Sequence, residues 1–213
     1  MVGNNGLNYK YKANEEEPFN LYVNDFDQNN STDIVLSYYN DGEEYPLRGR
    51  ECSSQQIPTI KKKFKNYETF SQASLIDVYS KKSIENSEHY QVNTFASVYL
   101  ENDKGKFNVK ELPIEAQFSS VTSFLIDDFD MDNKQEVVLA GNLFASEVET
   151  PRNDASCGLM LEFDKNSFIS IPSSKTGLFL NKDVKNMSTI KVQGKKYILV
   201  ANNNDFLQFV KVN

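Results

Sequence analysis

Short apolar runs with polar residues between them recur along the whole chain. They are rich in Val, Ile, Phe and Tyr, and turn signals such as Asn40-Asp41-Gly42 and Gln193-Gly194 separate them. Runs of this kind predict β-strands, and their spacing predicts an all-β chain of the propeller, barrel or sandwich kind. The expected strands cover residues 7–11, 19–23, 33–39, 94–100, 107–112, 121–126, 136–141, 158–163, 168–171, 188–192, 196–201 and 206–212.

Residues 57–80 interrupt this pattern. Apolar residues recur there at spacings of three, four and three, which places them on one face of a helix. The residues on this face are Ile57, Ile60, Phe64 and Tyr67. Pro58 suits the first turn of that helix. A second helix is predicted to begin at a Ser71 cap and to carry Ala73, Ile76 and Tyr79, so residues 57–80 form a short helical insertion.

Two acidic loops, residues 25–33 and 128–136, carry the clearest chemistry. Each has oxygen-bearing side chains at positions 1, 3, 5 and 9, a spacing that suits a hard cation with six or more oxygen ligands, above all calcium. The candidate ligands are Asp25, Asp27, Asn29, the carbonyl oxygen of Ser31 and Asp33 in the first loop, and Asp128, Asp130, Asp132, the carbonyl oxygen of Lys134 and Glu136 in the second. Position 6 is Asn30 or Asn133, and a positive φ is predicted there.

Two alternatives to a calcium loop of this kind are an EF-hand and a metal-free acidic hairpin. An EF-hand is excluded, because it needs Glu at position 12 and flanking helices, whereas position 12 is Leu36 or Leu139 within a short apolar run. A metal-free acidic hairpin stays open for either loop. The second loop is the stronger candidate, because it has four carboxylates and the first loop has three. Without a counter-ion, four carboxylates repel one another more strongly than three.

The two loops belong to a longer internal repeat. Residues 19–36 align with 122–139, and residues 187–200 resemble a third copy in which Gln193-Gly194 replaces the acidic loop, so no metal is expected there. Radial repetition of such units is typical of a β-propeller. The length predicts about three to four blades in one domain over residues 1–213. Such a partial propeller has open edges, which favours contact with the rest of a longer protein or with another copy.

The composition of the chain restricts the classes of molecule that it is expected to bind. The 213 residues carry a net charge of −7, which argues against nucleic acid or an anionic membrane as partner. No apolar stretch approaches the roughly 18 residues of a transmembrane segment, and no signal peptide is visible in this chain. Cys52 and Cys157 either form a disulfide or are two buried thiols.

The expected function is binding rather than catalysis. A polar loop with Glu147, Glu149, Arg152 and Asp154 is a candidate contact site for a protein or glycan ligand. His89, the only histidine, lies in a polar stretch that reads as an exposed loop, and no set of nucleophile, base and orienting residue stands out. The alternative is a calcium-dependent polysaccharide lyase in which Lys or Tyr serves as the base.

The acidic loops also carry a family resemblance. The chain resembles FG-GAP/VCBS repeat proteins, whose Asp-Phe-Asp-x-Asp/Asn-Gly-x-x-Asp loop lies between two strands, although Asn30 and Asn133 replace the Gly and Glu136 the last Asp. More narrowly, it looks like the C-terminal part of bacterial exported proteins related to cartilage acidic protein, on residues 6–8, 48–58, 64–73, 112–113, 116–118, 140–142 and 154–156. The resemblance implies a seven-bladed or similar propeller, calcium in the blade loops and an extracytoplasmic location (cell surface, periplasm or secreted). It implies no known reaction.

Overall fold

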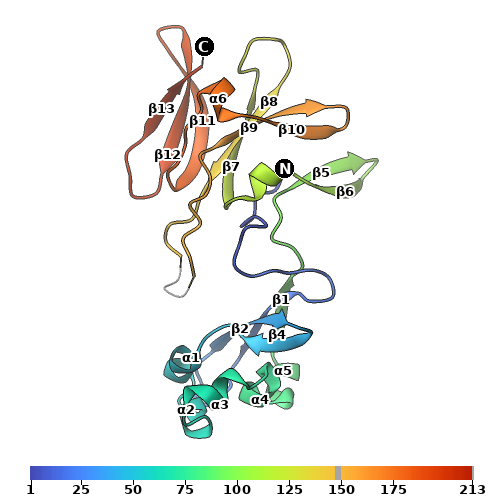
Figure 1. Cartoon of the computed structure of the whole chain (residues 1–213), viewed down its shortest axis with the longest axis vertical. Coiled ribbons are helices and arrows are strands. Elements are labelled where there is room, and N and C mark those ends of the chain that lie inside the picture. Colours follow the sequence, from blue (N-terminus) through green and yellow to red (C-terminus); the bar gives the residue numbers. More distant parts are fainter. Residues whose placement is uncertain (147–149, 213) are drawn as a thin grey trace. The chain divides into compact units, whose positions relative to one another are not determined.

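The computed structural model describes residues 1–146 and 150–212. Within them, thirteen strands form four antiparallel sheets, accompanied by a few short helices (Figure 1). The predicted all-β class is therefore confirmed. The chain divides into two compact units: unit 1 combines Met1–Lys10 with Phe95–Asn213, and unit 2 is Tyr11–Thr94. The prediction of a single domain is based on the internal repeat. A repeat in the sequence does not show which parts of the chain form separate hydrophobic cores.

Unit 2 is built on a four-stranded sheet with the order β3-β2-β1-β4. Its strands are β1 (Phe19–Asn24), β2 (Asp33–Asn40), β3 (Glu43–Pro46) and β4 (Glu88–Val92). The β1–β2 hairpin carries the first acidic loop, and its register places Asn24 opposite Asp33. Tyr22 and Val35 from this hairpin are buried in a core that residues of the helical segment complete.

Five short helices lie between β3 and β4. They are α1 (Arg50–Gln56), α2 (Thr59–Lys63), α3 (Tyr67–Ser71), α4 (Leu75–Tyr79) and α5 (Lys81–Glu85). A helical insertion is therefore present, but the two predicted helices are wrong in detail. Ile57 and Phe64 end α1 and α2, so they do not share one continuous helix. Ser74 caps α4 by a capping box with Asp77, whereas Ser71 is the last residue of α3.

Unit 1 holds the remaining described sheets. The largest has the order β10-β9-β8-β7, and its β7–β8 hairpin carries the second acidic loop with Asp127 opposite Glu136. A three-stranded sheet has the order β11-β12-β13, and β5 pairs with β6. The elements are β5 (Val98–Asp103), β6 (Lys106–Glu111), η1 (Ile114–Gln117), β7 (Val121–Asp127), β8 (Glu136–Gly141), β9 (Leu159–Asp164), β10 (Ser167–Ile171), α6 (Ser173–Thr176), β11 (Val184–Val192), β12 (Lys195–Asn202) and β13 (Gln208–Lys211).

Strand β8 is buried along its whole length because both of its faces are covered. Val138 and Ala140 join a core cluster with residues of β11 and β12, while Val137 and Leu139 join a second cluster. Alternate residues of a strand point to opposite faces, so the sheet β7–β10 is sandwiched between two apolar layers. Neighbouring propeller blades also pack face to face, but none of the described sheets closes, and the propeller stays a prediction.

Most predicted strands are present, with some errors. The strand predicted over 136–141 matches β8 in both bounds. The strand predicted over 7–11 is wrong, because this segment forms bends and turns in which the Asn8 N–H donates to the carbonyl oxygen of Gln117. β3 and β4 are missing from the prediction, since their largely polar residues lack an apolar alternation.

The segment predicted to be a third copy of the repeat forms the β11–β12 hairpin. Its strands join through Gln193 and Gly194, which have φ of 49° and 77°. Two successive positive φ values are what a two-residue type I′ turn requires. The two predicted strands are therefore present and are joined by a tight turn, while the repeat itself stays a prediction.

Two further predictions concern the cysteines and the membrane. Neither Cys52 nor Cys157 forms a disulfide. Cys157 is exposed, so it is not a buried thiol either. Among the described residues, no helix has the length and apolar character needed to cross a membrane.

Candidate metal centre

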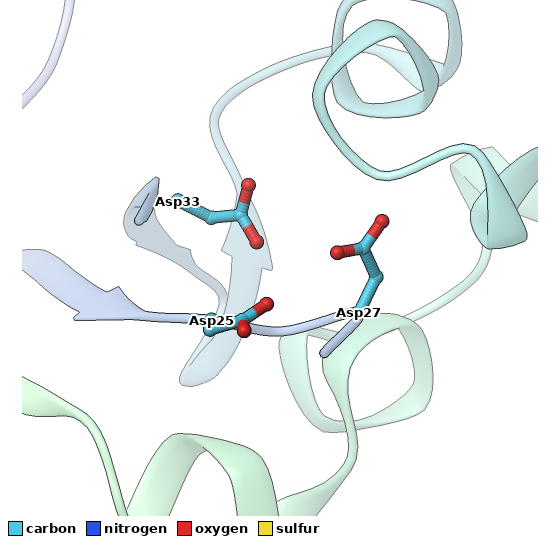
Figure 2. A group of neighbouring side chains, drawn as sticks. All are labelled: Asp25, Asp27 and Asp33. Carbon is cyan, nitrogen blue, oxygen red and sulfur yellow. The ribbon is translucent and has the colours of Figure 1, made fainter. Parts of the chain in front are cut away.

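The first acidic loop brings three carboxylates together between β1 and β2. One oxygen each of Asp25, Asp27 and Asp33 lies within 4.8 Å of the others. Figure 2 shows the three carboxylates turned towards a common region, with Asp25 and Asp27 following the first strand and Asp33 opposite them. Positions 1, 3 and 9 of the loop thus converge, as their spacing predicts.

Backbone N–H groups of the loop hold these carboxylates in place. Asp25 accepts the N–H of Asn30 at 2.8 Å, which closes the loop on its first residue. Asp33 accepts the N–H of Phe26 at 2.9 Å, which ties the start of β2 to the start of the loop. The acidic side chains are therefore part of the loop's own fold, and this keeps them close despite their charge.

The second loop repeats these hydrogen bonds at the equivalent positions. Asp128 accepts the N–H of Asn133 at 3.1 Å, and Glu136 accepts the N–H of Phe129 at 2.8 Å. Oxygens of Asp128, Asp130 and Glu136 lie within 4.8 Å of one another. The longer Glu136 side chain thus takes the place of Asp33. The likeness of the two loops extends from residue spacing to hydrogen bonding.

The side chain at position 5 accepts a backbone hydrogen bond within its own loop in both cases. Asn29 accepts the N–H of Ser31 at 2.7 Å, and Asp132 accepts the N–H of Lys134 at 2.8 Å. The Lys134 ammonium also lies 3.2 Å from Asp132, which is not one of the three carboxylates in the second cluster. The side chains at position 5 and the carbonyl oxygens of Ser31 and Lys134 stay predicted ligands.

Both loops use left-handed backbone at positions 4 and 6. Asn30 and Asn133 have φ of 66° and 67°, which confirms the prediction for position 6. Gln28 and Met131, at position 4, also have positive φ, of 60° and 65°. Neither residue type favours this conformation, so the sequence carries no signal for it. The shared alternation gives the two loops the same backbone path.

The closing carboxylate of each loop resists ionisation. Burial raises the pKa of Asp33, and the charges of Asp27 and Asp25 raise it further, against the lowering effect of a backbone N–H. Burial likewise raises the pKa of Glu136, and three Asp side chains of its loop add to the shift. A bound cation would remove the repulsion that these carboxylates exert on one another.

Each loop also contains a buried carboxylate oxygen that has no hydrogen-bond partner among the described residues. These atoms are Oδ1 of Asp27 and Oδ1 of Asp128. A buried acceptor that lacks a partner costs free energy, more so when it is charged. A cation would be such a partner, and the donor set, made of oxygens alone, suits a hard divalent ion. The residues present therefore fit the predicted metal.

The surroundings of the two loops differ in charge. Lys196 of β12 places Nζ 2.8 Å from Oδ1 of Asp127 and 3.1 Å from the carbonyl oxygen of Asp128. Its hydrogen bond holds the pKa of Asp127 below its usual range. The first loop has Asn24 at that position, and this amide donates to the carbonyl oxygen of Ser83. No sequence signal points to Lys196, because only the packing of β12 brings it to the loop.

A phenylalanine at position 2 anchors each loop in its core. The Phe26 ring lies 5.2 Å from the Tyr79 ring and packs against the core of unit 2. Phe129 is buried in the core that the sheets β7–β10 and β11–β13 share. The same residue thus binds the closing carboxylate through its N–H and the core through its ring.

The candidate contact loop lies between β8 and β9 and is described in part. Glu147 and Glu149 fall outside the described residues. The Arg152 guanidinium stacks over the Phe144 ring, 3.9 Å from its centroid, and its Nε lies 3.8 Å from Asp154. Arg152 and Asp154 are exposed, so both are accessible to a ligand.

His89 lies on β4, so its prediction as an exposed loop residue is wrong in its secondary structure. Its ring stacks on Tyr22, with centroids 4.6 Å apart, and its Nε2 lies 2.9 Å from the side-chain oxygen of Asn20. Asn20 in turn donates to Glu44 at 2.7 Å. These contacts join three strands of the sheet and give His89 a structural role.

Comparisons with protein families, with curated proteins and with solved structures found no match to this chain. The family resemblance therefore stays a prediction, and the candidate site rests on the geometry of the two loops.

Proposed function

We propose that this chain is a calcium-binding module in which each acidic loop holds one structural calcium ion. The observation that carries the proposal is the repeated loop skeleton, with a buried carboxylate oxygen in each loop that has no partner among the described residues. Calcium accepts a flexible shell of six to eight oxygens, which accommodates both Asp33 and the longer Glu136 at position 9. The ion would supply the positive charge that lets the clustered carboxylates stay ionised.

Calorimetric titration of the EDTA-stripped protein with calcium and with magnesium tests this proposal. Two calcium sites are expected, and Asp27→Asn and Asp128→Asn should each remove one. Asp41→Asn and Asp103→Asn are matched controls, because they remove the same charge from exposed residues outside the loops. Absence of calcium binding, or equal losses in variants and controls, would sink the proposal.

The module is further proposed to bind a protein or glycan ligand at the cell surface, in the periplasm or outside the cell. Support comes from the face-to-face antiparallel sheets, from the exposed Arg152 and Asp154, and from the resemblance to exported repeat proteins. Weak calcium sites with Kd of about 10⁻⁴–10⁻³ M are typical of extracellular modules. A glycan array probed with calcium and with EDTA, comparing Arg152→Ala with the exposed control Lys175→Ala, tests the ligand surface.

The lyase alternative is not part of this proposal. His89, the only histidine, lies on the edge strand β4, where its ring stacks on Tyr22 and its Nε2 lies close to Asn20, and no contact among the described residues favours a catalytic arrangement. Release of an unsaturated product from uronate polymers, followed by its absorbance, would reverse this choice.

A further inference from the structure

A cleft in unit 1 lies between the hairpins β5–β6 and β9–β10. Its volume is about 310 Å³, at the lower end of the range of about 300–1,000 Å³ that is typical of small-molecule sites. Figure 1 shows the two hairpins next to each other, and the Tyr99 ring of β5 lies 5.3 Å from the Phe168 ring of β10. A cleft of this size suits a single-ring molecule better than a helix or strand of a partner protein.

One part of the lining is aromatic and is held in place by the core. Tyr99 and Phe168 both line the cleft and pack edge to face, with an angle of 79° between their ring planes. Both rings also pack against the core cluster that contains Leu112, which is 4% exposed and lines the cleft as well. Because the core fixes these rings, they offer a preformed apolar surface to a ligand.

The rest of the lining is polar. Asn166 and Ser167 line the cleft from the turn between β9 and β10, in which Lys165 and Asn166 have φ of 45° and 75°. Two successive positive φ values are typical of a type I′ turn, which fixes the backbone at Asn166. Among the described residues, the Asn166 amide and the Glu111 carboxylate have no hydrogen-bond or ion-pair partner, so both are available to a ligand.

The charges in the lining disfavour an ionised ligand. Lys110 and Glu111 give the lining one charge of each sign, and Nζ of Lys110 lies 3.0 Å from Oε2 of Glu101. An anion would meet Glu111 and a cation would meet Lys110, so a ligand of either sign meets a like charge. A purely apolar ligand would leave polar groups of the lining without hydrogen bonds, which costs free energy. A neutral ring with an apolar C–H face and several hydroxyl groups fits both parts of the lining.

We propose that this cleft binds one residue of a neutral sugar. The C–H face of the sugar ring stacks on Tyr99 and Phe168, and its hydroxyl groups exchange hydrogen bonds with Asn166 and Glu111. This inference rests on the proposed glycan-binding role and deepens it, because it names the class of sugar and a site whose lining does not include Arg152.

Titration of the full chain in calcium, followed by saturation-transfer NMR, tests this inference. The probes are glucose, galactose, mannose and N-acetylglucosamine, with glucuronate as the charged comparison. At least one neutral sugar should bind, and more tightly than glucuronate. Asn166→Gly should weaken that binding about tenfold, because it removes the amide while Gly keeps the positive φ of the turn. Asn204→Gly is the matched control, since Asn204 has a φ of 51° in an exposed turn of unit 1 outside the cleft.

A second variant tests the aromatic part of the lining. Tyr99→Leu removes a ring but keeps an apolar side chain, and it should also weaken the binding about tenfold. Thermal melts establish which variants fold, and Asn166→Gly serves if Tyr99→Leu does not. Binding that both variants leave at wild-type strength would overturn the inference, and so would an equal loss in Asn204→Gly or a preference for glucuronate.

The outcomes also separate this inference from the proposed function. Sugar binding that Arg152→Ala abolishes and Asn166→Gly leaves intact would keep the proposed function and overturn the cleft as the site. Absence of binding by every one of these sugars would overturn the inference. A signal on the glycan array would then still support the proposed function, whereas a blank array would remove its glycan part as well.

Discussion

Each calcium ion is expected to stabilise only the unit that holds its loop. The first loop lies in unit 2 and the second in unit 1, and each unit has its own core cluster. A ligand at a hundred times its Kd stabilises the state that binds it by about 2.7 kcal/mol. For a unit the size of Tyr11–Thr94 this corresponds to a rise in Tm of roughly 10–20 °C. Calcium should therefore shift two separable unfolding events.

Asp27→Asn is the sharpest perturbation of this scheme. Oδ1 of Asp27 has no hydrogen-bond partner among the described residues, so the substitution breaks no hydrogen bond at that atom. Carboxylate oxygens within 4.8 Å of one another repel by at least about 1 kcal/mol in water and at least about 3.5 kcal/mol at an effective dielectric constant of 20. The variant should thus match or exceed the wild-type stability in EDTA, yet lose the calcium shift of unit 2.

Hydrogen exchange read by mass spectrometry, with and without calcium, resolves the two units. Asp27→Asn should abolish the calcium-dependent protection of β1 and β2 and spare that of β7 and β8. Asp128→Asn should affect the second hairpin, and Asp41→Asn, which removes the same charge from an exposed turn of unit 2, should change neither. Full calcium protection of unit 2 in Asp27→Asn, or loss in both units, would refute the reasoning.

Three further predictions concern stability. In EDTA, the free energy of unfolding should rise as the pH falls from 7 towards about 4. Burial raises the folded-state pKa of Asp33 and Glu136, so protonation removes the cost of keeping these buried carboxylates ionised. Urea unfolding at several pH values measures this, and a steady fall in stability over that range would contradict it. Ser74→Ala should cost about 1 kcal/mol in urea unfolding by removing the cap of α4, with a smaller cost for Ser71→Ala, which caps no helix. Gly141→Ala should destabilise unit 1 by several kcal/mol or prevent folding, because its Cβ would lie 1.8 Å from a backbone carbonyl oxygen; a wild-type melt would contradict this.

The features that the sequence predicts are those whose causes are local. The acidic loops qualify, since the spacing of Asp25, Asp27 and Asp33 and the hydrogen bonds that hold them lie within nine residues. Strand β8 qualifies because its run of buried apolar residues is uninterrupted up to Gly141. In both cases residue type and spacing are enough to define the element.

The features that the sequence misses depend on partners far away in the chain. Lys196 reaches Asp127 across 69 residues, and β4 forms only by pairing with β1. The apolar spacing over 57–80 is also misleading, because Tyr67 and Ile76 are exposed on short helices rather than buried on long ones. Periodicity reports a helical tendency but not where the backbone breaks it.

The residue at position 2 explains how an ion on a surface loop can act on a whole unit. The N–H of Phe26 donates to Asp33, one of the three clustered carboxylates, while its ring packs against Tyr79 in the core. Phe129 joins Glu136 to the core of unit 1 in the same way. Repulsion between the carboxylates of a calcium-free loop therefore acts on a phenylalanine that is packed in the core. An ion that removes this repulsion should stabilise the loop and the core together.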